Sequence, residues 1–320
     1  MSTYVAELPM ILDRVVVRAA ERVSPSVMRF ELGGDRLADF GVDGPVLDQR
    51  IKLIFPNADG LLPSFAAADE SWWTTWQRMP EAERGSIRTY TIRDVVGSGT
   101  DTRLVVDIVV HEPAPGEVPD GAGNAWALGA RVGDELITIC PRRGHAFGGI
   151  EWAPDGADRL LIVGDETAAP AIRGILRDLP AHARGAVFLE TVTAADAYDD
   201  IVAPAGVSVT WLPRDGGGRG ARLQPAVLDH LTGAGASGPL TVDADEVDPD
   251  LWETPVYSSS GEATGPATDT AVGAFPGLYA WIAGESRVVT GLRRALVGLG
   301  VDRRQVAFMG YWRDGVAMRS

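Results

Sequence analysis

The stretch Arg88-Thr89-Tyr90-Thr91-Ile92-Arg93 decides how the first half of this chain is interpreted. Its alternation is typical of a β-strand, and it sets an aromatic ring, a hydroxyl and two guanidinium groups on nearby positions. Such a ring can cover one face of a flavin, the hydroxyl can hydrogen-bond the flavin's polar edge, and arginine can clamp phosphate through two parallel hydrogen bonds. The hexapeptide therefore predicts a flavin dinucleotide site. The alternative is an ordinary edge strand with a half-buried Tyr90.

Bulk composition narrows the classes of protein that fit. The chain has 320 residues, of which 45% are hydrophobic and 23% charged, as expected for a soluble protein of two domains. A net charge of −15 argues against nonspecific nucleic-acid binding, which needs a positive field. We expect no membrane insertion and no secretory signal, because no apolar run is long enough and residues 1–14 lack a basic start. These features predict a cytoplasmic protein.

Cysteine, histidine and lysine are all scarce. The single cysteine, Cys140, excludes an intrachain disulfide and a cysteine-ligated cluster built from this chain alone. With four histidines, we expect no dedicated metal site. Lysine occurs once, at Lys52, among 29 basic residues. A position that keeps lysine in so arginine-rich a chain is a candidate for a role that needs a compact, flexible ammonium, and chance is the alternative.

Residues 1–150 are predicted to form a small antiparallel β-barrel. Short β-branched segments separated by turn residues indicate this fold. The expected strands are 12–20, 27–32, 50–55, 87–95, 103–110 and 135–139. Trp72, Trp73 and Trp76 recur at near-helical spacing, which predicts a short helix whose tryptophans pack on the barrel.

Residues 151–320 are predicted to form an α/β domain with a parallel sheet. The chain alternates expected strands at 160–163, 187–190, 207–212, 280–283 and 306–311 with expected helices at 168–178, 224–231 and 287–299. Residues 232–276 are rich in Gly, Ala, Ser, Thr and acids, so we expect a long loop there. The sequence does not say whether that loop is a lid or an interface.

Further motifs follow the hexapeptide in both halves. Asp107, Val109 and His111 lie along one expected strand, and His111 can bond a ribityl chain or phosphate, or serve only as a structural hydrogen-bond partner. Small residues around Ala125-Trp126-Ala127 precede a short helix, whose backbone N–H groups can approach a pyrophosphate. The second half carries GDETA at 164–168, WIAGE at 281–285 and GYWR at 310–313.

Together these motifs resemble the siderophore-interacting proteins, a branch of the ferredoxin-NADP reductase superfamily. RxYTxR, D-x-V-x-H, A-W-A and VGDE (residues 132–135) occur in the family's order, and GDETA and GYWR are the most specific. The resemblance spans about residues 12–315, except 232–276. One departure is Cys140, where the family usually has glycine before the proline. The resemblance implies an FAD-binding barrel and a nicotinamide-binding α/β domain.

The resemblance also assigns site residues. It implies cofactor-binding roles for Arg88, Tyr90, Thr91, Arg93, Asp107, Val109, His111, Ala125, Trp126, Ala127, Asp165, Thr167, Ala168 and Trp312. Nicotinamide binding would fall to Gly284, Glu285 and Arg214, and siderophore binding to Lys52, Arg142 and Arg143.

Several roles in the second half stay open. Thr167 is expected to cap the helix that follows it, and Glu285 either orients the nicotinamide or caps a helix. Trp312 either lies against the flavin or seals the sheet. Arg214 or Arg219 can meet a 2′-phosphate and favour NADPH, whereas Glu190 can hold ribose hydroxyls and favour NADH.

The predicted function is a flavin-dependent ferric-siderophore reductase in which NADPH or NADH reduces FAD and electrons then pass to Fe(III). Such chemistry comes from the cofactor, so no catalytic side chain and no protein ligand to iron are needed. One alternative is a flavin oxidoreductase of the same fold with a quinone, free flavin or ferredoxin as acceptor. Another is a non-catalytic siderophore-binding protein. We expect a monomer.

Overall fold

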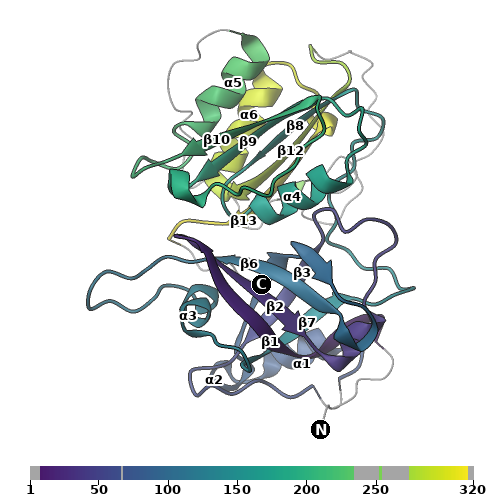
Figure 1. Ribbon diagram of the computed structural model, residues 1–320, viewed down its shortest axis with the longest axis vertical. Coiled ribbons are helices and arrows are strands. Elements are labelled where there is room, and N and C mark those ends of the chain that lie inside the picture. Colours follow the sequence, from purple (N-terminus) through teal and green to yellow (C-terminus); the bar gives the residue numbers. More distant parts are fainter. Residues whose placement is uncertain (1–7, 66–67, 234–251, 254–273, 316–320) are drawn as a thin grey trace. The chain divides into compact units, whose positions relative to one another are not determined.

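The computed structural model describes residues 8–65, 68–233, 252–253 and 274–315. The chain divides into two compact units, Met1–Ile150 and Glu151–Arg319, which are labelled by their elements in Figure 1. Most of the loop expected at 232–276 lies outside the described residues. No helix in the described part of the chain is long and apolar enough to cross a bilayer.

The first unit is built on a seven-stranded antiparallel sheet in the order β4-β3-β7-β1-β2-β6-β5. Its strands are β1 (Met10–Ser24), β2 (Val27–Gly33), β3 (Arg50–Phe55), β4 (Ser86–Thr91), β5 (Asp94–Val96), β6 (Arg103–Val109) and β7 (Glu135–Pro141). The long strand β1 has register shifts between Val17 and Ala19 and between Arg22 and Ser24, where the strand bends. The expected antiparallel fold is confirmed, as a half-barrel.

The strand expected at 87–95 is broken in two. β4 pairs with β3, whereas β5 pairs with β6 at the opposite edge of the sheet. Between them, the N–H of Ile92 donates to the carbonyl of Gln49 and the N–H of Arg93 to that of Val105. The chain therefore crosses from one edge strand to the other within two residues.

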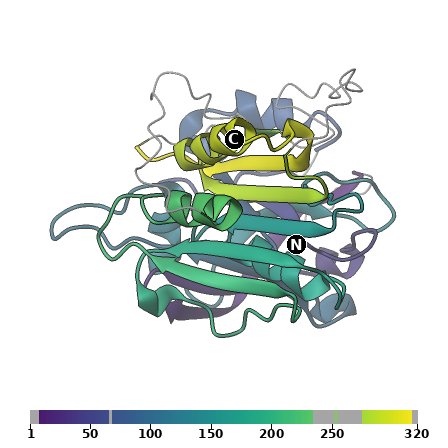
Figure 2. The same cartoon turned by 90° about the horizontal axis from the view of Figure 1, so that it is seen from above.

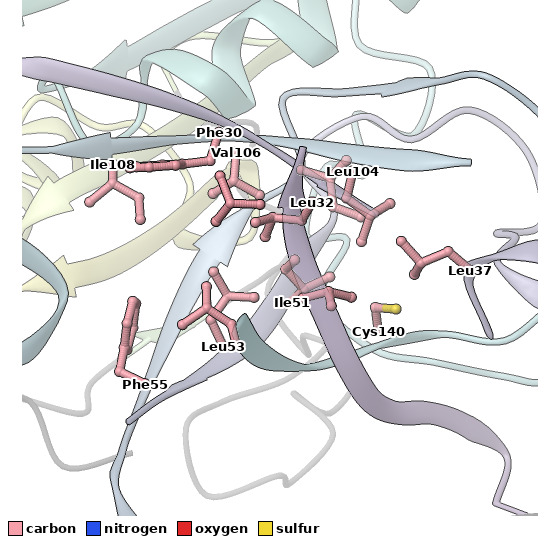
Figure 3. Packing of buried hydrophobic residues seen from close by; sticks show 14 of the residues in the cluster. Phe30, Leu32, Leu37, Ile51, Leu53, Phe55, Leu104, Val106, Ile108 and Cys140 are labelled. Carbon is pink, nitrogen blue, oxygen red and sulfur yellow. The ribbon is translucent and has the colours of Figure 1, made fainter. Parts of the chain in front are cut away.

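Each face of this sheet has its own apolar cluster, because successive side chains of a strand point to opposite sides. One face carries Ile51 and Leu53 with Phe30, Leu104 and other buried residues (Figure 3). The opposite face carries Ile54 and Ile87, which pack with Trp72 and Trp76 of helix α1 (Trp72–Arg78). The expected helix and its packing are thereby confirmed. Two further helices, α2 (Glu81–Arg84) and α3 (Ala122–Gly129), complete the unit.

The second unit holds a six-stranded sheet in the order β10-β9-β8-β12-β13-β11. Its strands are β8 (Arg159–Gly164), β9 (Gly185–Thr191), β10 (Val207–Pro213), β11 (Trp252–Glu253), β12 (Leu278–Glu285) and β13 (Val306–Trp312), and its helices are α4 (Ala169–Asp178), α5 (Leu223–Thr232) and α6 (Ser286–Gly298). All pairs are parallel except β11 with β13. Helices α5 and α6 share one apolar cluster with the sheet, and α4 covers the other face (Figures 1 and 2).

Candidate functional site

In the first unit, Tyr90 of β4 packs against the start of helix α3. Its ring meets Phe55 edge-on, with centroids 6.0 Å apart. Its hydroxyl lies 2.1 Å from the point that a Cβ on Gly123 would occupy, so only glycine permits this approach. Burial raises the pKa of Tyr90 well above its ordinary value, which keeps the hydroxyl neutral and able to donate a hydrogen bond.

Helix α3 includes the small residues that we expected to precede it. It begins at Ala122, after Gly121 with φ of 78°, so Gly123 and the Ala-Trp-Ala motif lie within the helix. Trp126 packs its ring 5.0 Å from that of Phe30, Ala127 is buried, and Ala125 is exposed. No acidic residue occupies the first turn, so the positive end of the helix dipole is not neutralised by the helix's own side chains.

His111 and Asn124 join the end of β6 to helix α3. The side-chain amide of Asn124 accepts from the His111 N–H at 2.9 Å and donates to the His111 carbonyl at 3.0 Å. The imidazole of His111 is left exposed, and Val109 is half-buried two residues earlier. Asn124 is thus a positioning residue that the motif alone did not single out.

Arg93 and Asp107 form a buried charge network with Arg29. Arg93 is 3% exposed, and its Nε donates to Asp107 Oδ2 at 2.8 Å. Asp107 also accepts two hydrogen bonds from Arg29, at 2.7 and 3.0 Å. The Nε of Arg93 is therefore committed to Asp107. Arg88 differs, because it is half-buried and its Nη1 donates to the carbonyl of its neighbour Ile87 at 2.7 Å.

Thr91 and Lys52 lie on the face of the sheet that α1 covers in part. Thr91 is 6% exposed. Lys52 Nζ lies 3.3 Å from Thr89 Oγ1 and 6.0 Å from the centroid of the Trp73 ring. Burial, and then the neighbouring Arg50, lower the pKa of Lys52. This ammonium is therefore held beside an aromatic ring instead of extending freely into water.

Arg142 and Arg143 follow directly after β7. Arg142 is half-buried and donates to the Leu8 carbonyl at 3.0 Å, whereas Arg143 is exposed and donates to the Phe40 carbonyl at 3.1 Å. Both arginines are thus held to the main chain by one hydrogen bond. Cys140 before them is fully buried, and burial raises the pKa of its thiol to about 12.

In the second unit, Asp165 is the centre of a buried network at the carboxyl edge of the sheet. Its Oδ1 accepts from the Thr167 N–H at 2.9 Å and the Thr167 hydroxyl at 2.5 Å. Its Oδ2 accepts from the Glu285 N–H and from Trp312 Nε1, both at 2.8 Å. Burial, and then the charge of Glu166, raise the pKa of Asp165 to about 6 although these hydrogen bonds oppose the rise.

Two expectations about helix caps at this edge can now be resolved. Thr167 does not cap α4, because the residue before the helix is Ala168, which has no cap bond, and the Thr167 hydroxyl turns back to Asp165. Glu285 does cap α6, accepting from the N–H groups of Arg287 and Val288 at 2.8 and 3.0 Å. Gly284, with φ of 145°, leaves room for Asp165, whose Cγ would lie 2.7 Å from a Cβ there.

Arg214 is locked in a second buried network. It is 8% exposed, its two terminal nitrogens donate to both oxygens of Glu166 at 2.7 Å, and Nη1 also reaches Glu190 at 3.1 Å. Glu190 further accepts from the Gly220 N–H, and burial raises the pKa of Glu190. Two of the three groups expected to discriminate NADPH from NADH, Arg214 and Glu190, are therefore engaged with other parts of the protein.

A pocket lies above the carboxyl edge of this sheet, the side on which open α/β sheets bind ligands. It is lined by Val163, Asp165, Glu190, Arg219, Leu223, Ile282, Ala283, Gly284, Glu285, Val288, Val289 and Leu292. Arg219 lies over the Trp312 ring, 4.7 Å from its centroid, and pairs with Asp314 at 3.0 Å. In the described ranges, no group of three His, Cys, Asp or Glu side chains is placed to hold a metal ion.

Comparison with known proteins identifies both units. Residues 16–145 match the siderophore-interacting FAD-binding domain, and residues 157–315 match the siderophore-interacting protein family. The chain is 34% identical over 209 residues to the ferric vibriobactin reductase of Vibrio cholerae, covering 65% of this chain and 67% of that protein. It is 26% identical over 302 residues to an NADPH-dependent ferric-chelate reductase of Escherichia coli, covering 93% and 91%.

The fold is also shared with a solved structure. A siderophore utilization protein of T. fusca superimposes with a TM-score of 0.64 at 25% identity, over 98% of this chain and 96% of that one. The chain spans 64% of the length of the mycobacterial relatives that it matches. The resemblance inferred from RxYTxR, GDETA and GYWR is thus confirmed. The chain belongs to the siderophore-interacting protein family.

Proposed function

We propose that this protein is an FAD-dependent ferric-siderophore reductase that takes electrons from NADPH or NADH. The observation that carries the proposal is that an FAD-binding domain model and a siderophore-interacting model match the chain in succession. The names of the Vibrio and Escherichia relatives, both ferric reductases, support the reaction class. A monomer acting in the cytoplasm is part of the proposal, with ferredoxin as a further candidate partner.

The residues around Tyr90 fit an FAD. Gly123 brings the start of α3 against the tyrosine, and the first turn of α3 carries no acid, so its N–H groups suit a pyrophosphate. In the proposal, Tyr90 covers the flavin ring, Thr91 bonds its polar edge and Arg88 clamps phosphate. FAD, when bound there, would supply the redox chemistry that links the nicotinamide to Fe(III).

The basic side chains attract the substrate, a polyanionic iron chelate. Lys52 sits beside Trp73, while Arg142 and Arg143 are exposed to different degrees after β7. The protein as a whole carries a net charge of −15, which repels a negatively charged chelate. These three positive side chains offset that repulsion locally. Hard oxygen chelators bind Fe(II) weakly, so reduction releases the metal without a protein ligand.

An anaerobic reduction series tests the function. Purified FAD-loaded protein is mixed with NADPH or NADH, bleaching of the flavin absorbance is followed, and a ferric siderophore is then added with a trap for Fe(II). We expect bleaching, followed by recovery of the flavin colour together with trapped Fe(II). Bleaching without Fe(II) would favour a flavin oxidoreductase with another acceptor. A colourless protein that cannot be reconstituted with FAD would contradict the proposal and favour a siderophore-binding protein.

A further inference from the structure

The pocket at the carboxyl edge of the second unit has acidic walls. Asp165, Glu190 and Glu285 line it, and each is at most 5% exposed. Each carboxylate lies at the end of a strand and accepts hydrogen bonds from main-chain N–H groups of a turn or helix start. The main-chain N–H groups that would ordinarily donate to a phosphate at such an edge therefore already donate to carboxylates of the protein.

The neighbouring arginine is equally engaged. Arg214 donates to Glu166 through both terminal nitrogens and is 8% exposed, so its charge is balanced within the protein. Among the described residues that line the pocket, Arg219 carries the only cationic side chain. Its side chain is 35% exposed, and its partner Asp314 is 54% exposed. Ion pairs this exposed contribute little stability, so replacing Asp314 by another anion as the partner of Arg219 costs little free energy.

Arg219 also lies in a glycine-rich connection between a strand and a helix. Asp215-Gly216-Gly217-Gly218-Arg219-Gly220 joins β10 to α5. Gly216 and Gly220 have φ of 83° and 74°, and a Cβ at Gly216 or Gly218 would meet nothing within 4 Å. The main chain on one side of Arg219 is thus open to a ligand, as in loops that bind phosphate closely.

We propose that Arg219 is the residue of this unit that binds a phosphate group of the nicotinamide dinucleotide, exchanging Asp314 for the phosphate. The inference rests on the proposed function, because it takes the dinucleotide as electron donor. The three wall carboxylates repel a phosphate from the rest of the pocket and so direct it to the glycine-rich connection. Both the 2′-phosphate and the diphosphate carry negative charge that a guanidinium can bind, and the probes below distinguish the two.

Calorimetric titration of the FAD-loaded protein with 2′,5′-ADP, 2′-AMP and 5′-ADP tests the assignment. We expect Arg219→Gln to weaken binding of at least one probe about tenfold, the loss of roughly one charge-assisted hydrogen bond. Asp314→Asn should tighten the same probe about two- to threefold, since it frees the guanidinium. Loss of 2′-AMP binding alone would assign Arg219 to the 2′-phosphate, and loss of 5′-ADP binding alone to the diphosphate.

Arg222→Gln is the matched control. Arg222 is an exposed arginine three residues further on, it bonds the Pro213 carbonyl, and it does not line the pocket. Its substitution should leave probe binding unchanged. Equal binding by Arg219→Gln and the wild type, or no binding of any probe at millimolar concentration, would overturn the inference. Because binding needs no electron transfer, these outcomes are separate from a failure of NADPH and NADH to reduce the flavin.

Discussion

Trp312 Nε1 donates a 2.8 Å hydrogen bond to Oδ2 of Asp165, a residue 147 positions earlier in the chain. The same oxygen accepts from the main-chain N–H of Glu285. One carboxylate therefore ties together the carboxyl ends of β8, β12 and β13. This arrangement gives Asp165 a structural role at the edge where the pocket lies, and it fixes the indole of the GYWR motif.

Asp165→Asn should remove a pH-dependent component of stability. The pKa of Asp165 is about 6 in the folded chain, against a reference of 3.8. Between these values the folded chain holds a proton that the unfolded chain has lost, so the wild-type free energy of unfolding falls as pH rises through this window. Relative to the variant, we expect the free energy of unfolding of the wild type to fall by about 3 kcal/mol between pH 3.5 and pH 7.

Urea unfolding of both proteins across this pH range measures the difference. The difference in free energy of unfolding between the two proteins could instead stay constant, or grow in favour of the wild type as pH rises. Either result would mean that the four hydrogen bonds to Asp165 outweigh its burial. The pKa would then lie at or below its ordinary value, and the prediction would be wrong.

Gly123→Ala should destabilise the first unit by about 1–3 kcal/mol, because the added methyl group overlaps the Tyr90 hydroxyl. Combining it with Tyr90→Phe removes that hydroxyl and should recover most of the loss. Thermal unfolding of the single and double variants measures the effect. Gly129→Ala, at the other end of α3, is the control. A Cβ added at Gly129 would meet no atom within 4 Å, so this substitution should be neutral or slightly stabilising. Equal stability of the two alanine variants would refute the close contact.

Arg88→Ala should weaken FAD binding about tenfold or more, since it removes a charge-assisted contact to phosphate. Fluorescence titration of the apoprotein with FAD measures the dissociation constant. Arg22→Ala is a suitable comparison, because Arg22 is exposed and pairs with Glu112 on the surface. Unchanged FAD affinity in Arg88→Ala would remove Arg88 from the proposed flavin site.

Lys52→Met should lower ferric-siderophore reduction about tenfold while leaving flavin content intact, because it deletes a charge that attracts the chelate but keeps the apolar stem beside Trp73. Steady-state Fe(II) trapping measures the first quantity and flavin absorbance the second. Lys52→Arg retains the charge but replaces the compact ammonium with a planar guanidinium, so it should keep only part of the activity. Loss of flavin from Lys52→Met would place Lys52 in the cofactor site instead.

The two-domain fold was largely predictable from local patterns. The strand expected at 50–55 has those bounds in the structure, and the others, except the one expected at 87–95, differ by a few residues. The break between β4 and β5 was not predictable, because it depends on hydrogen bonds from Ile92 and Arg93 to residues far away in sequence. Periodicity reports which face a side chain occupies but not which strand its main chain will join.

The candidate site was predictable in its aromatic and glycine residues and not in its charges. Tyr90 lies in a strand and Gly284 lies at the end of one, as their motifs indicated. Arg214 was expected to be available for phosphate, yet it is buried with Glu166, 48 residues away. Spacing along a chain does not specify which arginine meets which carboxylate, because the partners come from different strands.

Lys52 has one more consequence, for chemical labelling. It is the sole side-chain primary amine in the chain, and its lowered pKa leaves more of it in the reactive free-base form at neutral pH than an ordinary lysine has. An amine-selective dye applied to the folded protein would therefore modify this position and, apart from it, only a free chain terminus. A single fluorophore could thus be installed beside Trp73 without engineering a cysteine.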